Sequence, residues 1–519
     1  MLREGRPSHR QSSSIHSAQA VDDASFSQCA KLTGSSTRDD IFLIGPDYIE
    51  CKNMIHFTVN LLQSLGFKLN LEKSSLLPKK RCKFLGFIFN SEKMILTLPD
   101  TKKEKLRKSI DALLNLYKCK LREFAKFIGL LISCCPAIQY SWLYTKEFEY
   151  FKYSCLLNNP SYEQVVTIPK TLHDDLHWWL ENIDTGHSHL KLNIYSLEIF
   201  SDASSTGWGA FCNGHSCYGH WKDEERSLHI NELELRAAFL AIKCFTRQRS
   251  DCEILLRIDN VTAISCINRM GSVQYRHLNQ VTRDIWKWCE KRKIIIFASY
   301  INTKQNLEAD LLSRKKFQNT EWELSNYAFQ EITLQLGIPE IDLFASRCNA
   351  KCFTFVTWKA DPDAWAVDAF TISWHDKFFY AFPPFSLITK VMQKVINDKA
   401  EGIVVVPYWP TQAWFPLFQK LVISNIIYFE PNINLLKSPF RISHSLHKSL
   451  KLAAAKLSAH STRHAATSTA SRIGVSVDVI RKTAGWCQSS SVFAKFYNRE
   501  IVPSSDQFAR SILSNFDSQ

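Results

Sequence analysis

The segment from Leu197 to Arg314 constrains the fold most, because its apolar residues alternate between short strand-like runs and helical stripes. The predicted order is strand, strand, helix, strand, helix, strand, helix. Asn213-Gly214 lies between two short strand-like runs, which predicts a β-hairpin at that point. Strands that alternate with helices indicate an α/β layer built on a mixed sheet.

The chain of 519 residues is long enough for about three to five folded units. Its 64 Lys and Arg against 50 Asp and Glu give a net charge of +14, which favours a polyanionic partner. Sixteen cysteines without CxxC pairs indicate reduced thiols. The N-terminus shows no apolar signal region, and no apolar run reaches the ~18–20 residues of a membrane span. We therefore expect a soluble intracellular protein with no membrane partner.

Four acidic residues lie where the predicted strands end or helices begin: Asp202, Glu234, Asp259 and Asp310. Carboxylates in such places can converge on one edge of a sheet, where four of them would bind two divalent cations ~3.5–4 Å apart. Hard oxygen ligands favour Mg²⁺ or Mn²⁺ over zinc. Glu232 would project from a different side of its helix. The alternative is that each acid is a solvated turn residue or a helix cap.

The order and surroundings of these acids resemble the ribonuclease H domain of retroelement polyproteins. Asp202 precedes a Gly-rich hairpin, Glu234 precedes Leu-Arg-Ala-Ala, Asp259 precedes Asn, and Asp310 lies in Glu-Ala-Asp-Leu-Leu-Ser-Arg. The resemblance implies a ribonuclease H-like domain over 197–316, with flanking helices and two Mg²⁺ or Mn²⁺ ions bound by the four acids. It also implies hydrolysis of the RNA strand of an RNA–DNA hybrid. Tyr300 stands where that family often has a His that assists turnover, so slower product release is expected.

The upstream region resembles the palm of reverse transcriptases. Asp39 and Asp40 precede a buried-type strand, and the runs 65–70 and 84–87 are similar to palm and primer-grip segments of that family. The resemblance implies a partial palm over 37–98. Only 38 residues precede Asp39, too few for the fingers and for the strand that bears the other metal-binding Asp. We therefore expect an inactive polymerase remnant.

Residues 1–36 are rich in Ser and Gln and are expected to be a disordered leader. Residues 99–196 are expected to form a helical thumb and connection that includes the aromatic run 177–179. A basic stretch, together with the cluster 102–108, would neutralise phosphates, the alternative being a solvated helix face. The basic stretch comprises Lys79, Lys80, Arg81 and Lys83.

A further α/β block is predicted over 335–435. Its runs 341–345 and 380–386 resemble the adenine-methyltransferase-like region of DIRS-like retrotransposons. Phe382 stands where active amino-methyltransferases have an Asn or Asp acceptor, so we expect no methyl transfer. The alternative is a proline-rich turn beside a strand. Trp358, Trp365 and Trp374 are expected in the core, the alternative being a base-stacking platform.

The C-terminal part, 443–519, is expected to be mostly helical. His460 and Arg463 share a helical face, and Trp486 and Tyr497 follow. This order is similar to the second half of a tyrosine recombinase site. By that resemblance Tyr497 would attack a DNA phosphate that Arg463 clamps, while His460 and Trp486 support the transition state. The family's first active-site Arg is not found upstream, so we expect a partial domain that contacts DNA and can oligomerise.

The order of these parts over 39–519 resembles DIRS-like retrotransposon polyproteins. The fold expected is α/β multidomain, with a ribonuclease H-like mixed sheet between a partial palm and a second α/β block with a recombinase-like tail. The function implied is ribonuclease H cleavage, with an RNA–DNA hybrid and DNA as partners. We expect the protein in the nucleus, with the cytoplasm as the alternative. Two further alternatives are a non-catalytic DNA- or hybrid-binding relic and a DNA strand-transfer enzyme.

Overall fold

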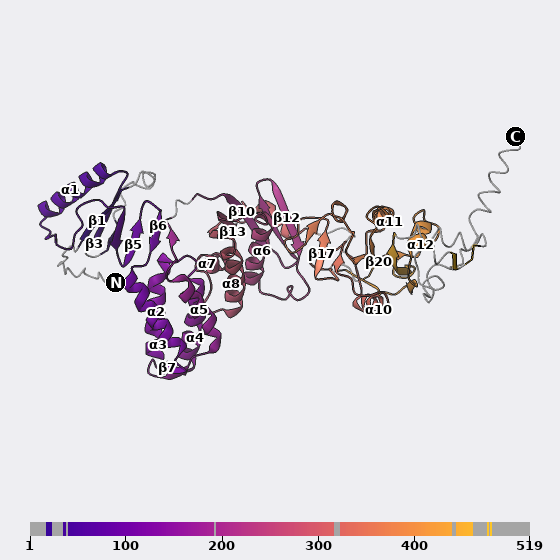
Figure 1. The fold of residues 1–519 in the computed structure, drawn as a ribbon, viewed down its shortest axis with the longest axis horizontal. Helices are drawn as coiled ribbons and strands as arrows, with labels where there is room; N and C mark the ends of the chain where they lie inside the picture. Colours follow the sequence, from indigo (N-terminus) through magenta and orange to yellow (C-terminus); the bar gives the residue numbers. More distant parts are fainter. Residues whose placement is uncertain are drawn as a thin grey trace, which may run out of the picture. The chain divides into compact units, whose positions relative to one another are not determined.

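The computed structural model describes residues 17–22, 35–37, 40–190, 194–315, 322–438, 443–459, 475–476 and 478–479. Figure 1 shows the ribbon of the chain, which divides into two compact units. The first comprises 1–202 and 229–307, and the second comprises 203–228 and 308–519. Within the described ranges no helix combines the length and apolar character needed to cross a bilayer. The cysteines that the structure describes are all free thiols.

The first unit begins with a three-stranded sheet in the order β1 (Ser17–Asp22), β3 (Asp40–Gly45), β2 (Ser35–Thr37). Strand β1 runs parallel to β3, and β2 runs antiparallel to it. Strand β1 lies within the leader expected over 1–36, and it pairs with the backbone groups at the edge of β3. Helix α1 (Tyr48–Ser64) follows, capped by the Asp47 carboxylate, which accepts from the Glu50 amide at 2.8 Å.

A second sheet is antiparallel, in the order β4 (Arg81–Phe84), β5 (Phe87–Asn90), β6 (Ile95–Thr97), β9 (Ser188–His189). Along β4, Cys82 and Phe84 are buried and Arg81 and Lys83 are exposed, as the twofold period of a strand requires. Phe84 stacks on Phe42 with ring centres 4.8 Å apart, so the two sheets share a core.

Four helices occupy the predicted thumb and connection: α2 (Asp100–Leu114), α3 (Leu121–Cys134), α4 (Lys146–Asn158) and α5 (His173–Asn182). A short ribbon of β7 (Lys118–Lys120) and β8 (Val165–Thr167) joins them. The indole of Trp179 is fully buried and donates to the Tyr144 carbonyl at 3.0 Å. The aromatic run therefore packs in the core of this helical part.

The first unit ends with three parallel strands in the order β10 (Leu197–Ala203), β13 (Cys252–Ile258), β14 (Ile294–Tyr300). Its helices are α6 (Ile230–Phe245), α7 (Val261–Asn268) and α8 (Arg276–Glu290). Helix α8 also contacts the helical connection, because Tyr144 Oη and Trp178 Nε1 donate to the Glu290 carboxylate at 2.5 and 2.8 Å.

The second unit contains the antiparallel hairpin β11 (Gly207–Cys212) and β12 (His215–His220), with helix α9 (Leu307–Ser313) beginning at the unit boundary. The hairpin confirms the turn predicted at Asn213-Gly214. Both turn residues have positive φ, 49° and 80°, which a two-residue hairpin turn of this kind requires.

The core of the second unit is a seven-stranded mixed sheet. Its order is β18 (Ala366–Val367), β17 (Thr354–Thr357), β16 (Ile341–Asp342), β19 (Phe379–Ala381), β20 (Glu401–Pro407), β23 (Leu452–Ser458), β21 (Ile427–Phe429). The first five strands are parallel, and β23 is antiparallel to both of its neighbours. A separate two-stranded ribbon consists of β15 (Glu323–Leu324) and β22 (Leu436–Lys437).

Strand β23 corrects the expectation of short helices after residue 443. Ala453 and Ala455 pack on one face with α11 (Ile388–Asn397) and α12 (Phe415–Leu421). Ala454 packs on the other face with α10 (Asn326–Leu336). These alanines favour a helix locally, but pairing between two strands and burial on both faces override that preference.

Candidate active site

Three of the four predicted carboxylates lie together in the first unit. Asp202 is in β10, Glu234 is in the first turns of α6, and Asp259 directly follows β13. One carboxylate oxygen of each lies within 4.8 Å of those of the other two. Asp202 and Glu234 are 3% and 4% exposed, and Asp259 is half-buried. Their catalytic role stays a prediction.

The pairing of β10 with β13 explains why two of the acids meet. Phe200 pairs with Arg257 in this parallel ladder. The same register, continued along both strands, brings Asp202 beside Asp259 at the carboxyl edge of the sheet. This is where the first strand and its parallel neighbour both end.

Two asparagines fix the start of α6 against the turn after Asp259. Asn260 Nδ2 donates to Asn231 Oδ1 at 2.9 Å, and Asn260 Oδ1 caps α7 by accepting from the Ala263 amide at 2.9 Å. His229 Nδ1 accepts from the Asn231 amide at 3.2 Å. The start of α6, which carries Glu234 in its second turn, is thereby held at the same sheet edge.

The loop after β14 supplies polar residues that the sequence analysis missed. Thr303 Oγ1 donates to Asp259 Oδ2 at 2.8 Å, which orients that carboxylate. The buried Asn306 donates from Nδ2 to the Ser201 carbonyl at 3.0 Å, next to Asp202. The polar run from Asn302 to Asn306, directly after a strand, is the signal that could have identified them.

Among the described residues of the first unit, Glu232 and Tyr300 do not belong to this group. Glu232 is buried and accepts from Arg236 at 2.9 Å, as expected for a residue on another side of α6. Asp310 belongs to the second unit, where both Nε and an Nη of Arg314 donate to its Oδ1 at 2.8 Å. Its place in the site stays a prediction. Tyr300 is exposed at the end of β14.

The three clustered carboxylates suit a divalent cation. Carboxylates this close repel one another, and a bound cation would offset that repulsion. All the donors are hard oxygens, the type that Mg²⁺ and Mn²⁺ prefer. The donor set therefore fits the predicted metal chemistry, with Asp202, Glu234 and Asp259 as the ligands.

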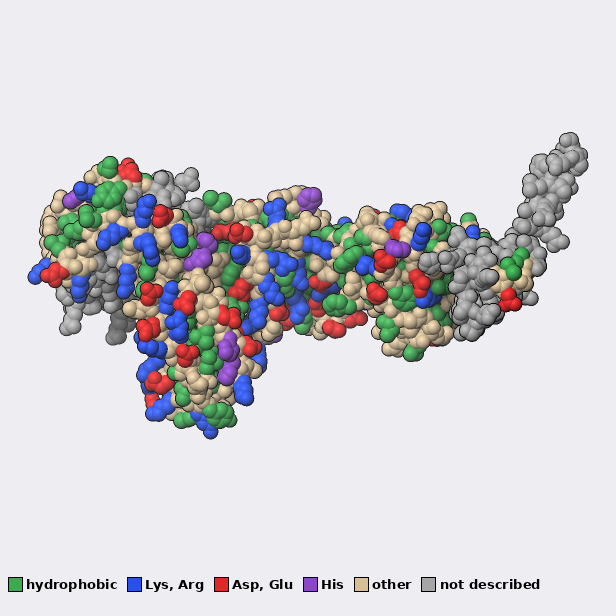
Figure 2. All heavy atoms as spheres, in the orientation of Figure 1, with side chains coloured by type: hydrophobic (Ala, Val, Ile, Leu, Met, Phe, Trp, Pro, Cys, Tyr) green, Lys and Arg blue, Asp and Glu red, His purple; other side chains and the backbone are tan. Residues whose placement is uncertain are grey.

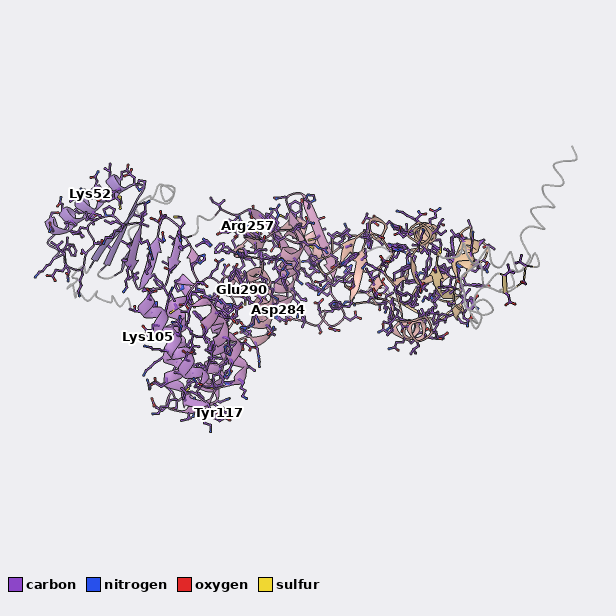
Figure 3. The ribbon with its side chains drawn as sticks, in the orientation of Figure 1. Lys52, Lys105, Tyr117, Arg257, Asp284 and Glu290 are labelled. Carbon is purple, nitrogen blue, oxygen red and sulfur yellow. The ribbon has the colours of Figure 1, made fainter. Side chains whose placement is uncertain are left out.

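The predicted phosphate-binding cations differ in their surroundings. The side chains of the stretch around β4, namely Lys79, Lys80, Arg81 and Lys83, are all exposed. In the cluster 102–108, Lys102 Nζ instead donates to the Ser133 carbonyl at 2.6 Å, and Arg107 binds both oxygens of Asp184. Lys105 is exposed on the outer side of α2, where Figures 2 and 3 show basic side chains. Part of this cluster therefore fastens helices to one another.

Most of the residues predicted for the polymerase-like and recombinase-like sites lie outside the described part of the chain. Asp39 lies outside the described residues, and Asp40 begins β3. The recombinase-like residues also lie outside the described part of the chain: His460, Arg463, Trp486 and Tyr497.

In the methyltransferase-like block, Asp342 ends β16 in a fully buried position. Burial raises its pKa to about 6, although the amides of Phe344 and Lys351 donate to it at 3.2 and 3.0 Å. Of the three tryptophans expected in the core, only Trp374 is buried. Trp358 and Trp365 are 60% and 47% exposed, so that expectation is wrong for both.

No protein-family model and no curated protein matches this sequence. Among solved structures, ribonuclease H1 of the halophilic archaeon Halobacterium salinarum is similar at 13% identity with a TM-score of 0.20, over 22% of this chain and 92% of that one. A ribonuclease H1 isolated from compost is similar at 19% identity with a TM-score of 0.19, over 23% of this chain and 93% of that one.

A foamy viral protease–reverse transcriptase in complex with double-stranded DNA is similar at 14% identity with a TM-score of 0.26. That likeness covers 51% of this chain and 46% of the viral one, so this chain spans less than half of the viral enzyme. Because the TM-scores are low, these likenesses establish neither the fold of the whole chain nor its activity.

Proposed function

We propose that the segment 197–314 is a ribonuclease H-type hydrolase that uses two divalent cations to cut the RNA strand of an RNA–DNA hybrid. The observation that supports it is the meeting of Asp202, Glu234 and Asp259 within 4.8 Å at one edge of a parallel sheet. Asp310 is proposed as the fourth carboxylate. The retroelement motifs around these acids support the choice of substrate.

In this proposal the three clustered carboxylates hold Mg²⁺ or Mn²⁺. Bound ions of this kind activate a water and stabilise the leaving oxygen of a phosphodiester. The protein contributes position: Thr303 orients Asp259, and the link between Asn260 and Asn231 fixes the helix that carries Glu234. A well-positioned ligand set matters because catalytic geometry tolerates only small displacements.

The test is cleavage of a labelled RNA–DNA hybrid by the purified chain with Mg²⁺. Asp259→Asn keeps the size of the side chain but removes its charge. We expect cleavage to fall by more than about 100-fold, because loss of outer partners of a metal ligand alone costs about 10–100-fold. Hybrid binding should persist.

The matched control is Asp284→Asn. Asp284 is an exposed acid on α8 of the same unit and is labelled in Figure 3. This variant should cleave like the parent chain, and chelation of Mg²⁺ should abolish cleavage by both. Undiminished cutting by Asp259→Asn would remove the assignment.

A second candidate is a non-catalytic protein that binds DNA or hybrid. The net charge of +14 and the exposed cations around β4 favour it. It predicts binding that weakens steeply with salt and no metal-dependent turnover, so the same assay separates the two. The recombinase resemblance leads to a separate proposal of DNA strand transfer, tested by trapping a covalent DNA adduct that Tyr497→Phe abolishes.

A further inference from the structure

Two lysines and two aromatic rings form a continuous stripe in the second unit. Lys315 Nζ and Lys359 Nζ lie 4.5 and 4.8 Å from the centre of the Tyr218 ring. Lys359 Nζ also lies 5.3 Å from the centre of the Trp358 ring. We call these four residues the lysine–aromatic stripe. It joins β12 to the end of α9 and the end of β17.

Buried contacts hold the segments of the stripe together. Arg347 donates to both carboxylate oxygens of Glu225 at 2.8 and 2.6 Å, and the two side chains are 11% and 8% exposed. Cys348 Sγ donates to the His220 carbonyl at 3.0 Å, two residues after Tyr218. The stripe is therefore a preformed surface.

The acids closest to Lys359 in the sequence both accept from Arg347. Asp361 Oδ2 accepts from the Arg347 amide at 3.1 Å, and Asp363 Oδ2 accepts from Arg347 Nε at 3.1 Å. Each ammonium group of the stripe lies over an aromatic ring, a contact that attracts the cation.

At one end of the stripe, the 60%-exposed Trp358 borders a cavity of about 620 Å³. Phenylalanines form much of its wall, and it lies beyond the carboxyl ends of β16 and β19, where the strand order reverses. Crevices at such reversals are the usual ligand sites of parallel sheets. The wall also carries Thr357 Oγ1, which is buried and has no hydrogen-bond partner among the described residues.

Cations next to exposed aromatic rings are the composition that binds single-stranded nucleic acid, because the ammonium groups neutralise phosphates and the rings stack on bases. A duplex hides the faces of its bases and cannot use the rings. We propose that the second unit binds single-stranded nucleic acid on the lysine–aromatic stripe. Phosphates lie on Lys315 and Lys359, a base stacks on Trp358, and a neighbouring base reaches Thr357 in the cavity.

The experiment measures binding of fluorescent oligothymidylate and oligouridylate by anisotropy. It uses the full chain carrying Asp259→Asn, with a chelator, so it does not depend on cleavage. Trp358→Ala should weaken binding about tenfold, the effect of losing one stacked base. Lys315→Gln with Lys359→Gln should also weaken it and lower the slope of log affinity against log salt by about 1.4, or ~0.7 per lost phosphate contact.

The matched control is a second lysine–tryptophan pair of the same unit that lies off the stripe. Lys377 Nζ is 4.9 Å from the centre of the Trp365 ring, and Trp365 is 47% exposed. Trp365→Ala should bind like the parent, and Trp358→Phe should regain part of the lost affinity. Circular dichroism and thermal melting check that each variant folds.

Three outcomes would overturn the proposal. The stripe variants could bind both oligonucleotides like the parent, or Trp365→Ala could weaken binding as much as Trp358→Ala. The third is that the stripe variants lose as much affinity for a blunt duplex of the same length, whose bases cannot stack on Trp358. Comparing the two oligonucleotides then shows whether the strand is DNA or RNA.

Discussion

At the scale of single residues, Thr303 offers a test of the site that leaves every carboxylate in place. Its hydroxyl donates to Asp259 at 2.8 Å. Thr303→Val keeps the shape of the side chain and removes the hydrogen bond, so Asp259 loses its orientation. We expect the Mg²⁺ concentration for half-maximal cleavage to rise about tenfold, the effect typical of losing an outer partner of a metal ligand.

A Mg²⁺ titration of hybrid cleavage measures this change. Thr303→Ser keeps the donor and should behave like the parent. If Thr303→Val lowers the maximal rate but leaves the Mg²⁺ dependence unchanged, Thr303 does not act through a metal ligand.

His220 gives a prediction on pH. Burial lowers its pKa from 6.5 to about 4, with smaller contributions from nearby Lys359 and Arg226 and an opposing one from the Thr206 carbonyl. The unfolded chain takes up a proton below pH 6.5 that the folded chain takes up only near pH 4. The stability that this group contributes is therefore present above pH 6.5 and is lost as pH falls through 4.

We expect the unfolding free energy of the parent, relative to His220→Gln, to fall by about 3 kcal/mol between pH 7 and pH 4. Denaturant titrations at a series of pH values measure it. The pH dependence that Asp342 gives to the unfolding free energy has the opposite sign. Burial raises the pKa of this carboxyl to about 6, so the stability it contributes is lost as pH rises through that value. A difference between parent and His220→Gln that does not change with pH would contradict the prediction.

Residue patterns indicated the clustered acids but not their partners. Asp202 and Asp259 end apolar runs, and this is visible in the sequence because burial along a strand selects apolar residues. Thr303 and Asn306 lie in a loop, where no period exists, and only the path of the chain brings them to Asp259 and Ser201. The exposure of Trp358 could not be predicted for a similar reason. An aromatic residue favours the core in any sequence pattern, and only the path of the chain leaves this one exposed.

At the scale of elements, α8 is predicted to fasten the helical connection through Glu290. Burial and the hydrogen bond to Glu290 raise the pKa of Tyr144, so the phenol keeps its proton and donates. Glu290→Leu leaves the donors of Tyr144 and Trp178 unsatisfied. At about 1–3 kcal/mol each, the unfolding free energy of the first unit should fall by about 2–6 kcal/mol.

Denaturant unfolding followed by tryptophan fluorescence measures this loss. Asp284→Leu, on an exposed position of the same helix, should change the unfolding free energy by no more than about 0.5 kcal/mol. A loss for Glu290→Leu no greater than that of the control would show that the contact adds nothing.

The helices of the connection could be predicted from local sequence patterns, whereas β23 could not. Helices such as α3 carry their apolar stripe within one segment. A strand of small residues such as Ala453–Ala455 fits only because β20 and β21 flank it and helices cover both faces. Those neighbours are distant in sequence, so helical propensity misled the prediction.

At the scale of the whole molecule, the hairpin β11–β12 belongs to the second unit, although its sequence resembles part of a ribonuclease H domain. The bond between Glu225 and Arg347, 122 residues apart, fastens it there. No local pattern could pair these two residues. The structure unites the hairpin with residues 308–519 in one compact unit, and the proposed stripe lies within this unit.

The strength of this union can be measured with a double-mutant cycle on Glu225 and Arg347. Arg347→Met leaves the Glu225 carboxylate buried without its main partner, which costs about 3–5 kcal/mol of unfolding free energy. In the double variant with Glu225→Met no charge of the pair remains, so the total loss should be smaller than the sum of the two single losses by at least about 2 kcal/mol. The control cycle uses the half-buried Lys451 and the exposed Glu430, an ion pair of the same unit, and should give about 0.5 kcal/mol or less. Additive losses at Glu225 and Arg347 would mean that other contacts hold the hairpin, and the stripe variants would then have to be judged without the assumption of a rigid support.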